Sequence, residues 1–378
     1  MASDSTPPNR GAAGTGPLQG VRVVEFAGIG PAPFCAMLLA DLGADVVRLA
    51  RPGSPLRAED LTLRSRLTVP VDLRSAPGRE SAVALVAQAD LLIEGFRPGV
   101  MERLGLGPDE LMGVQPRLVY GRMTGWGQYG PLAQAAGHDI NYIALSGVLD
   151  GIGSPDRPPI VPMNLIGDFG GGGMLLAVGL LAALHEASRS GQGQVVDAAM
   201  TDGAALLSTF IHGLRAEGQW RHPRGGNLLD GGAHFYGTFE CADGRCISIG
   251  SIEPQFYAEL LARCGLDAQA FGDHLNPERW PELKDRLAQL FRSRSRAHWC
   301  ERLEGSDVCF APVLDWDEAV AHPHNVARGT FTREGGLVQP SPAPRFSRSG
   351  ETAPQPPRLG SVGDVLRRWA PAPAGGGA

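Results

Sequence analysis

The chain has 378 residues, of which 43% are hydrophobic and 20% are charged. This length is sufficient for two domains that each bury a core, so neither disulfide nor metal staples are required. The formal net charge of −6 argues against nucleic acid or an anionic membrane as the main partner, because both select strongly basic surfaces.

The N-terminal half alternates strand and helix patterns. Residues 1–17 are rich in Pro, Gly, Ser and Thr without apolar periodicity, so they predict a disordered leader. Strands are expected at 21–26, 45–49, 91–94 and 118–122, and helices at 34–42 and 78–88. This order predicts an α/β fold, with a parallel, doubly wound (Rossmann-like) sheet covered by helices.

The C-terminal half predicts a second, smaller α+β domain. A helix at 173–188, a strand at 194–198 and a long helix at 202–217 precede a glycine-rich stretch. A hairpin (239–241 and 246–249), three helices (254–264, 280–292 and 297–304) and a last helix (362–369) follow. The apolar run at 174–184 is too short to span a bilayer, so it predicts a buried helix and no membrane partner.

These patterns predict a division of the chain into segments. The expected boundaries are a leader at 1–17, a large domain at 18–200, a linker helix and loop at 201–236, a small domain at 237–320, and a return segment with a C-terminal tail at 321–378. The six cysteines have no zinc-ligand spacing, and no secretory signal precedes the first strand. We therefore expect a reduced, cytoplasmic protein.

Two segments carry the residue types that a proton transfer at carbon requires. His138 stands in Gly137-His138-Asp139-Ile140-Asn141-Tyr142, and Asp168 stands in a predicted glycine-rich turn, Gly167-Asp168-Phe169-Gly170-Gly171. A 1,1-proton transfer removes a proton from one face of a carbon and returns one to the other, so it needs two bases. Taken alone, each residue is better explained as a helix cap or a helix-terminal charge than as a catalytic group.

These segments resemble the family III CoA transferases, and within that family the racemases that act on 2-methylacyl-CoA. The resemblance extends from Leu18 to Arg348 and includes residues 38–48 and 94–106. It implies a large and a small domain, an interlocked homodimer, and a C-terminal segment that returns to the large domain. It also implies an acyl-CoA substrate whose (R) and (S) forms are interconverted through an enolate, with no cofactor other than the CoA of the substrate and no metal.

The resemblance also implies roles for individual residues. His138 and Asp168 match the two catalytic bases, and Glu253 matches a carboxylate that orients the imidazole and raises its basicity. Guanidinium groups suit the phosphates of CoA. The CoA-binding positions correspond to Arg51, Val71, Asp72, Leu73, Arg74, Gly95, Phe96, Arg97, Arg103, Gly137, Asp139, Ile140, Asn141 and Tyr142. For Asp139 and Asn164, capping or hydrogen-bond support is at least as plausible as direct chemistry.

Three further expectations concern neighbouring residues. The glycines at 170–173 are expected to let the backbone approach the thioester and to expose helix N-terminal amides to the enolate oxygen. Arg64 and Arg66 are expected to be solvated surface charges. The segment 28–33 is not a dinucleotide loop, because it lacks the third glycine and Pro31 has no N–H for a phosphate.

Two alternatives remain open. In a family III CoA transferase, the aspartate at position 168 would attack a thioester and form an acyl-enzyme anhydride. A histidine before Asp139 favours racemisation, because the transferases generally lack it. The second alternative is a catalytically silent CoA-binding protein, which the retention of both bases and Glu253 disfavours.

Overall fold

The computed structural model describes residues 16–221, 223–350 and 353–370, so most of the predicted leader lies outside the described residues. The chain divides into two compact units. The first consists of the chain up to Ser146, Met163–Leu207, and the chain from Gly329 onward, and the second of Gly147–Pro162 and Ser208–Arg328. Gly147–Pro162 thus belongs to the second unit, although the sequence pattern had placed these residues with the large domain.

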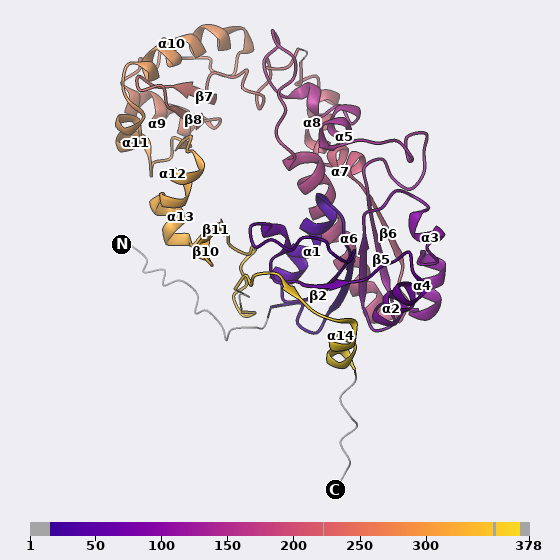
Figure 1. Ribbon diagram of the computed structural model, residues 1–378. Helices are drawn as coiled ribbons and strands as arrows, with labels where there is room; N and C mark the ends of the chain where they lie inside the picture. The colour runs from indigo at the N-terminus through magenta and orange to yellow at the C-terminus, as the bar shows by residue number, and fades with distance from the viewer. Residues whose placement is uncertain (1–15, 222, 351–352, 371–378) are drawn as a thin grey trace. The chain divides into compact units, whose positions relative to one another are not determined.

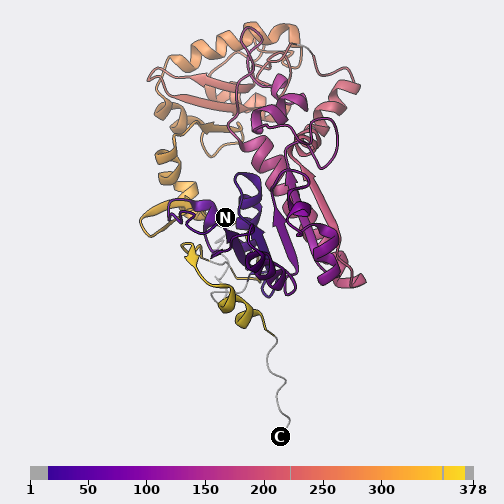
Figure 2. The ribbon, with the colours of Figure 1, turned by 45° about the vertical axis from the view of Figure 1, so that its right-hand side comes forward.

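The first unit is built on a parallel sheet. Within the described residues its seven strands run in the order β12-β3-β2-β1-β4-β5-β6. Their bounds are β1 Arg22–Phe26, β2 Asp45–Ala50, β3 Leu67–Pro70, β4 Leu91–Glu94, β5 Val119–Thr124, β6 Val195–Ala199 and β12 Arg358–Leu359. All pairings are parallel, and β5 and β6 lie side by side in Figures 1 and 2. The predicted α/β fold is confirmed.

Helices cover both faces of this sheet, as a doubly wound fold requires. Successive residues of a strand point to opposite faces, so Val23 packs in the core under the helices at 31–41 and 175–190, and Val24 in the core under the helices at 76–86, 108–114 and 362–369. The helices of the first unit are α1 Pro31–Asp41, α2 Ala76–Val86, α3 Val100–Arg103, α4 Pro108–Val114, α5 Asp139–Leu145, α6 Leu175–Ser190, α7 Met200–Leu207 and α14 Val362–Trp369, with a short 3-10 turn, η1, at Leu61–Leu63.

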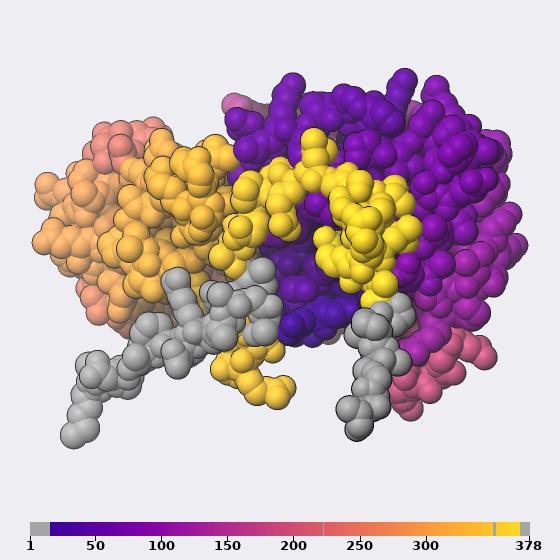
Figure 3. Space-filling view, turned by 60° about the horizontal axis from the view of Figure 1, so that its bottom comes forward, coloured from indigo at the N-terminus to yellow at the C-terminus, as the bar shows by residue number. Residues whose placement is uncertain are grey.

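Strand β3 was missed in the sequence, and the expectation of solvated arginines beside it was wrong. Arg66 is fully buried and pairs with Glu25 of β1. Arg64 is 6% exposed and donates to Asp41, with a second bond to the Gln339 side chain at 3.1 Å. The C-terminal segment places β12 on β3, and Figure 3 shows this segment (yellow) against the N-terminal residues (indigo). These charges are buried because chain segments distant in sequence cover them.

The glycine-rich segment around Asp168 is a helix, so the predicted turn is wrong. A π-helix, η3 (Leu165–Met174), continues into α6, and together they form a helix from Leu165 to Ser190. By length and composition alone this helix could cross a membrane, and 39% of its most apolar window is buried in the described residues. It contacts α1, α7, β5 and β6, as the core helix of a globular domain does.

The second unit contains a small antiparallel sheet covered by helices. Its strands are β7 Tyr236–Glu240, β8 Cys246–Gly250 and β9 Phe310–Pro312, and β7 pairs with β8 as the predicted hairpin. Its helices are α8 Thr209–Ala216, α9 Pro254–Cys264, α10 Trp280–Arg292, α11 Arg296–Leu303, α12 Trp316–Ala321 and α13 Pro323–Arg328, with 3-10 turns η2 Leu149–Gly151 and η4 Pro277–Arg279.

The long helix predicted at 202–217 is two helices, α7 and α8, separated at Ser208. A hairpin of β10 Phe331–Glu334 and β11 Leu337–Pro340 belongs to the first unit.

Candidate active site

A cavity of about 500 Å³ opens at the carboxyl ends of the parallel strands in the first unit. The chain turns from β1 to β2 and β3 on one side of the sheet and to β4 and β5 on the other. The loops after β1 and β4 therefore diverge, and the crevice between such loops is the usual ligand site of open α/β sheets. Residues 29–32, which follow β1, and 95–98, which follow β4, line this cavity.

His138 reaches the cavity from the start of α5. It is the N-cap residue of this helix, with extended backbone angles, and its N–H donates to the Asn141 side chain at 3.0 Å. Tyr142 anchors the helix, because its buried ring packs edge-on against Trp126 with centroids 4.7 Å apart. Gly137 makes room for this ring, since a Cβ there would lie 2.8 Å from it. The imidazole itself is exposed and lines the cavity.

Asp168 reaches the same cavity from the first turn of η3. Its N–H donates to Asp139 Oδ1 at 2.6 Å, and its Oδ2 accepts from Asn164 Nδ2 at 3.2 Å. The backbone of Gly30 approaches the carboxylate so closely that a Cβ there would lie 3.3 Å from Oδ2. Asn164 therefore holds the carboxylate, Asp139 of α5 holds the backbone that carries it, and the loop after β1 packs against it.

The surroundings of Asp168 make it a better base than an ordinary aspartate. Burial raises the pKa of its carboxyl above the usual value. The hydrogen bond from Asn164 lowers the pKa, the nearby charge of Asp139 raises it, and the imidazole of His138 lowers it, with a raised pKa as the result.

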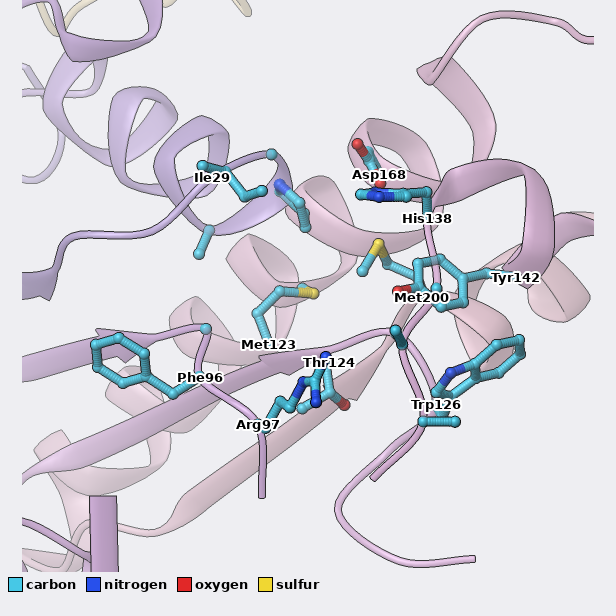
Figure 4. Close-up of a pocket in the computed structure, with 18 of the residues that line it drawn as sticks. Ile29, Phe96, Arg97, Met123, Thr124, Trp126, His138, Tyr142, Asp168 and Met200 are labelled. Atoms are coloured by element: carbon cyan, nitrogen blue, oxygen red, sulfur yellow. The ribbon is translucent and has the colours of Figure 1, made fainter. Parts of the chain in front are cut away.

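Figure 4 shows the imidazole of His138 and the carboxylate of Asp168 next to one another. Met123 and Met200 also line the cavity and add apolar side chains to its wall. Two different proton acceptors thus share one partly apolar space, the arrangement in which proton exchange at a weakly acidic carbon is feasible. In the described part of the chain, no group of three or more His, Cys, Asp or Glu side chains has the arrangement of a metal site.

The glycine run after Asp168 does not face this space, so the expected approach to a thioester is wrong. Gly171, Gly172 and Gly173 are buried in the helix and do not line the cavity. A Cβ on Gly171 would lie 2.7 Å from the backbone nitrogen of Ala204 in α7, and one on Gly173 would lie 2.7 Å from the Phe34 ring in α1. The run permits close packing of three helices, and its amides are not free for an enolate oxygen.

The model of the CoA-transferase family III matches residues 18–362. The chain belongs to this family. It is 46% identical over 357 residues to the Mus musculus protein named alpha-methylacyl-CoA racemase, covering 93% of both chains, and 46% identical over 328 residues to the Homo sapiens protein of that name, covering 86% of both. A CaiB/BaiF family protein from Brucella suis has the same fold, with a TM-score of 0.78, 26% identity, and coverage of 94% of this chain and 99% of that one.

The structure brings five of the positions predicted to bind CoA to the cavity. Gly95, Phe96, Arg97, Gly137 and Tyr142 line the cavity. The remaining positions, which do not line it, are Arg51, Val71, Asp72, Leu73, Arg74, Arg103, Asp139, Ile140 and Asn141. Arg51 follows β2 and residues 71–74 follow β3, so both stand at the same carboxyl edge of the sheet as the cavity. Asp139 is buried and Asn141 caps α5, which places both in supporting positions.

Glu253 belongs to the second unit. It is the exposed N-cap residue of α9, and its side chain does not bond to the helix N-terminus. The family role of orienting the imidazole therefore stays a prediction for this residue.

Several residues of the cavity were not found from the sequence. Met123, Thr124 and Trp126 lie at or after the end of β5, and Met200 begins α7. The signal for Thr124 and Trp126 was available, because polar and aromatic residues just after a predicted parallel strand stand at the ligand edge of the sheet, whereas the apolar Met123 gave no such signal. Met200 carries no such signal, since it meets the cavity only through the packing of α7 on η3.

Proposed function

We propose that this protein is a racemase that interconverts (R)- and (S)-2-methylacyl-CoA by a two-base 1,1-proton transfer. The observation that carries the proposal is the convergence of the His138 imidazole and the Asp168 carboxylate on one cavity at the switch point of the sheet. The relatives named for this activity support the substrate class.

In this mechanism one base takes the α-proton of the thioester and the other returns a proton to the opposite face. The α-carbon is weakly acidic, so the base needs a pKa closer to that of the carbon acid than an ordinary carboxylate has. We assign Asp168, whose pKa is raised, as the base on one face of this carbon and the imidazole of His138 as the base on the other. Met123 and Met200 give the enolate an apolar neighbour on the wall of the cavity.

The CoA portion of the substrate would be held by arginines at the sheet edge. Arg97 lines the cavity, and Arg51 and Arg103 are exposed after β2 and on α3. In a chain of net charge −6, local guanidinium groups are needed to attract the phosphates. We assign these three residues to CoA binding as part of the proposal.

The proposed assembly is a homodimer. Exposed apolar side chains cluster on α5, the Leu165–Ser190 helix and α7, which contact one another. They include Leu145 (61% exposed), Met174 (54%), Val178 (63%) and Leu207 (58%). An apolar surface of this kind is typical of an interface, and a second copy of the chain is the partner we propose.

The test is α-proton exchange in deuterium oxide, followed by NMR, with each enantiomer of a 2-methylacyl-CoA and no acceptor acid. Exchange with loss of configuration is expected, and His138→Ala and Asp168→Ala should each abolish that loss. His185→Ala, on the exposed face of α6, is the matched control and should racemise normally. CoA transfer only after addition of a carboxylate acceptor would establish a transferase with Asp168 as the nucleophile. Binding without exchange or transfer would indicate a silent CoA-binding protein.

A further inference from the structure

Asp139 directly follows His138 and begins α5, yet its side chain is turned into the protein. The residue is 6% exposed and does not line the cavity. Its Oδ1 accepts the N–H of Asp168 at 2.6 Å. Gly167 packs on the same group, because a Cβ at this glycine would lie 2.6 Å from Oδ1. One buried carboxylate therefore contacts the backbone on which Asp168 is carried.

The N–H of Asp168 needs this acceptor from outside its own helix. It lies in the first turn of the helix that runs from Leu165 to Ser190, where N–H groups have no carbonyl partner one turn earlier. A carboxylate is a strong acceptor for such a group, and its negative charge is favoured near a helix N-terminus. Asp139 thus acts as a cap that comes from a different helix.

We propose that Asp139 is a positioning residue that fixes the carboxylate of Asp168 relative to the imidazole of His138. Because His138 and Asp139 are consecutive, the same segment carries the imidazole and holds the backbone of the second base. The hydrogen bond from the Asp168 N–H to Asp139 therefore links the backbone of one base to the segment that carries the other. This inference rests on the proposed function, in which both groups exchange protons with one carbon.

The charge of Asp139 has a second effect on Asp168. The groups that face Asp168 are His138, Asp139 and Tyr142 from α5, Asn164 from its own helix, and the uncharged Gly30 and Met200 from the α1 and α7 sides. Among them, Asp139 is the group that raises the pKa of Asp168 by its negative charge, after the larger effect of burial. Neutralising Asp139 should therefore lower the pKa of Asp168 while the hydrogen bond is retained.

The experiment compares Asp139→Ala and Asp139→Asn in the full-length protein. Asp139→Ala removes the acceptor, and kcat should fall about 100-fold in both directions of the reaction with KM changed less than about twofold, as for a small misplacement of a catalytic group. Asp139→Asn keeps an acceptor, so it should recover most of that loss, and the acid limb of its kcat profile should move to lower pH. The control is Asp90→Ala, which removes a carboxylate bond to the Arg22 N–H at 2.9 Å away from the cavity and should leave kcat unchanged.

Amide hydrogen exchange of a peptide that contains Asp168 gives a readout independent of catalysis. Exchange of this amide should be faster in Asp139→Ala and unchanged in Asp90→Ala. Wild-type kcat and wild-type exchange in Asp139→Ala would overturn the inference. If that variant does not fold, an unshifted kcat profile in Asp139→Asn overturns it instead. A wild-type protein that does not racemise would refute the proposed function, which these variants do not test.

Discussion

Replacing His234 in the second unit with Gln should make the protein less sensitive to acid. The side chain is fully buried, and its Nε2 lies 2.8 Å from the Tyr257 hydroxyl, which itself donates to the Phe271 carbonyl. The ring meets Phe235 and Tyr257 edge-on, and its Nδ1 has no hydrogen-bond partner among the described residues. A charged imidazolium has no compensation in this environment.

The size of the effect follows from the shift in pKa. Burial, followed by the charges of His274 and Arg279, lowers the pKa of His234 from 6.5 to about 3. The unfolded state therefore binds more protons between these values, so the stabilising contribution is complete above about pH 6.5 and is lost as the pH falls toward 3. At about pH 5 the loss amounts to about 2 kcal/mol, or a decrease in Tm of about 4–8 °C.

Urea unfolding at about pH 5 and about pH 7.5 would measure this difference. His234→Gln should reduce the change in the free energy of unfolding between these pH values by about 2 kcal/mol. His274, whose pKa is also lowered by burial, accounts for part of the dependence that remains. His185→Gln, on an exposed position of α6, is the control and should behave as wild type. A His234→Gln protein with the full pH dependence would refute the reasoning.

Three other substitutions test the first unit. Gly125→Ala would place a methyl group inside the Tyr142 ring and displace the start of α5, so kcat should fall about 100-fold. Normal α-proton exchange in this variant would contradict the packing described. Glu25→Gln leaves Arg66 buried without its carboxylate, so the free energy of unfolding in urea should decrease by about 3–5 kcal/mol. A denaturation midpoint equal to that of the wild type would argue against the buried ion pair. Arg97→Ala should raise KM for acyl-CoA about tenfold or more in steady-state kinetics, with little change in kcat. An unaltered KM would show that Arg97 does not bind CoA.

The elements with strong local signals were predictable from the sequence. Strand β4 and helices α9 and α10 match their expected bounds, because β4 is a short continuous apolar run and the two helices have an apolar period and a proline in the first turn. Strand β3 was missed because Arg66 stands beside it and the partner Glu25 is far away in sequence. A charged side chain such as that of Arg66 argues against a buried strand unless its ion-pair partner is known.

The two candidate bases of the site were predictable from the sequence, but the helix that carries Asp168 was not. His138 and Asp168 stood out through the segments around them, and the structure places both on one cavity. The π-helix that carries Asp168 was not predictable, because four successive glycines have low helix propensity and favour a turn. Here α1 and α7 pack so closely that only glycine fits, and this tertiary contact outweighs the local preference.

The first unit is assembled from three separate stretches of chain, and this has a consequence for synthesis on the ribosome. Strand β12 pairs with β3 and α14 packs on α2, yet both are made after the whole second unit. The sheet beside which both proposed bases stand therefore stays incomplete until β12 has been synthesised, with the edge of β3 open to other chains. The second unit, whose core forms between residues 233 and 308, can close first.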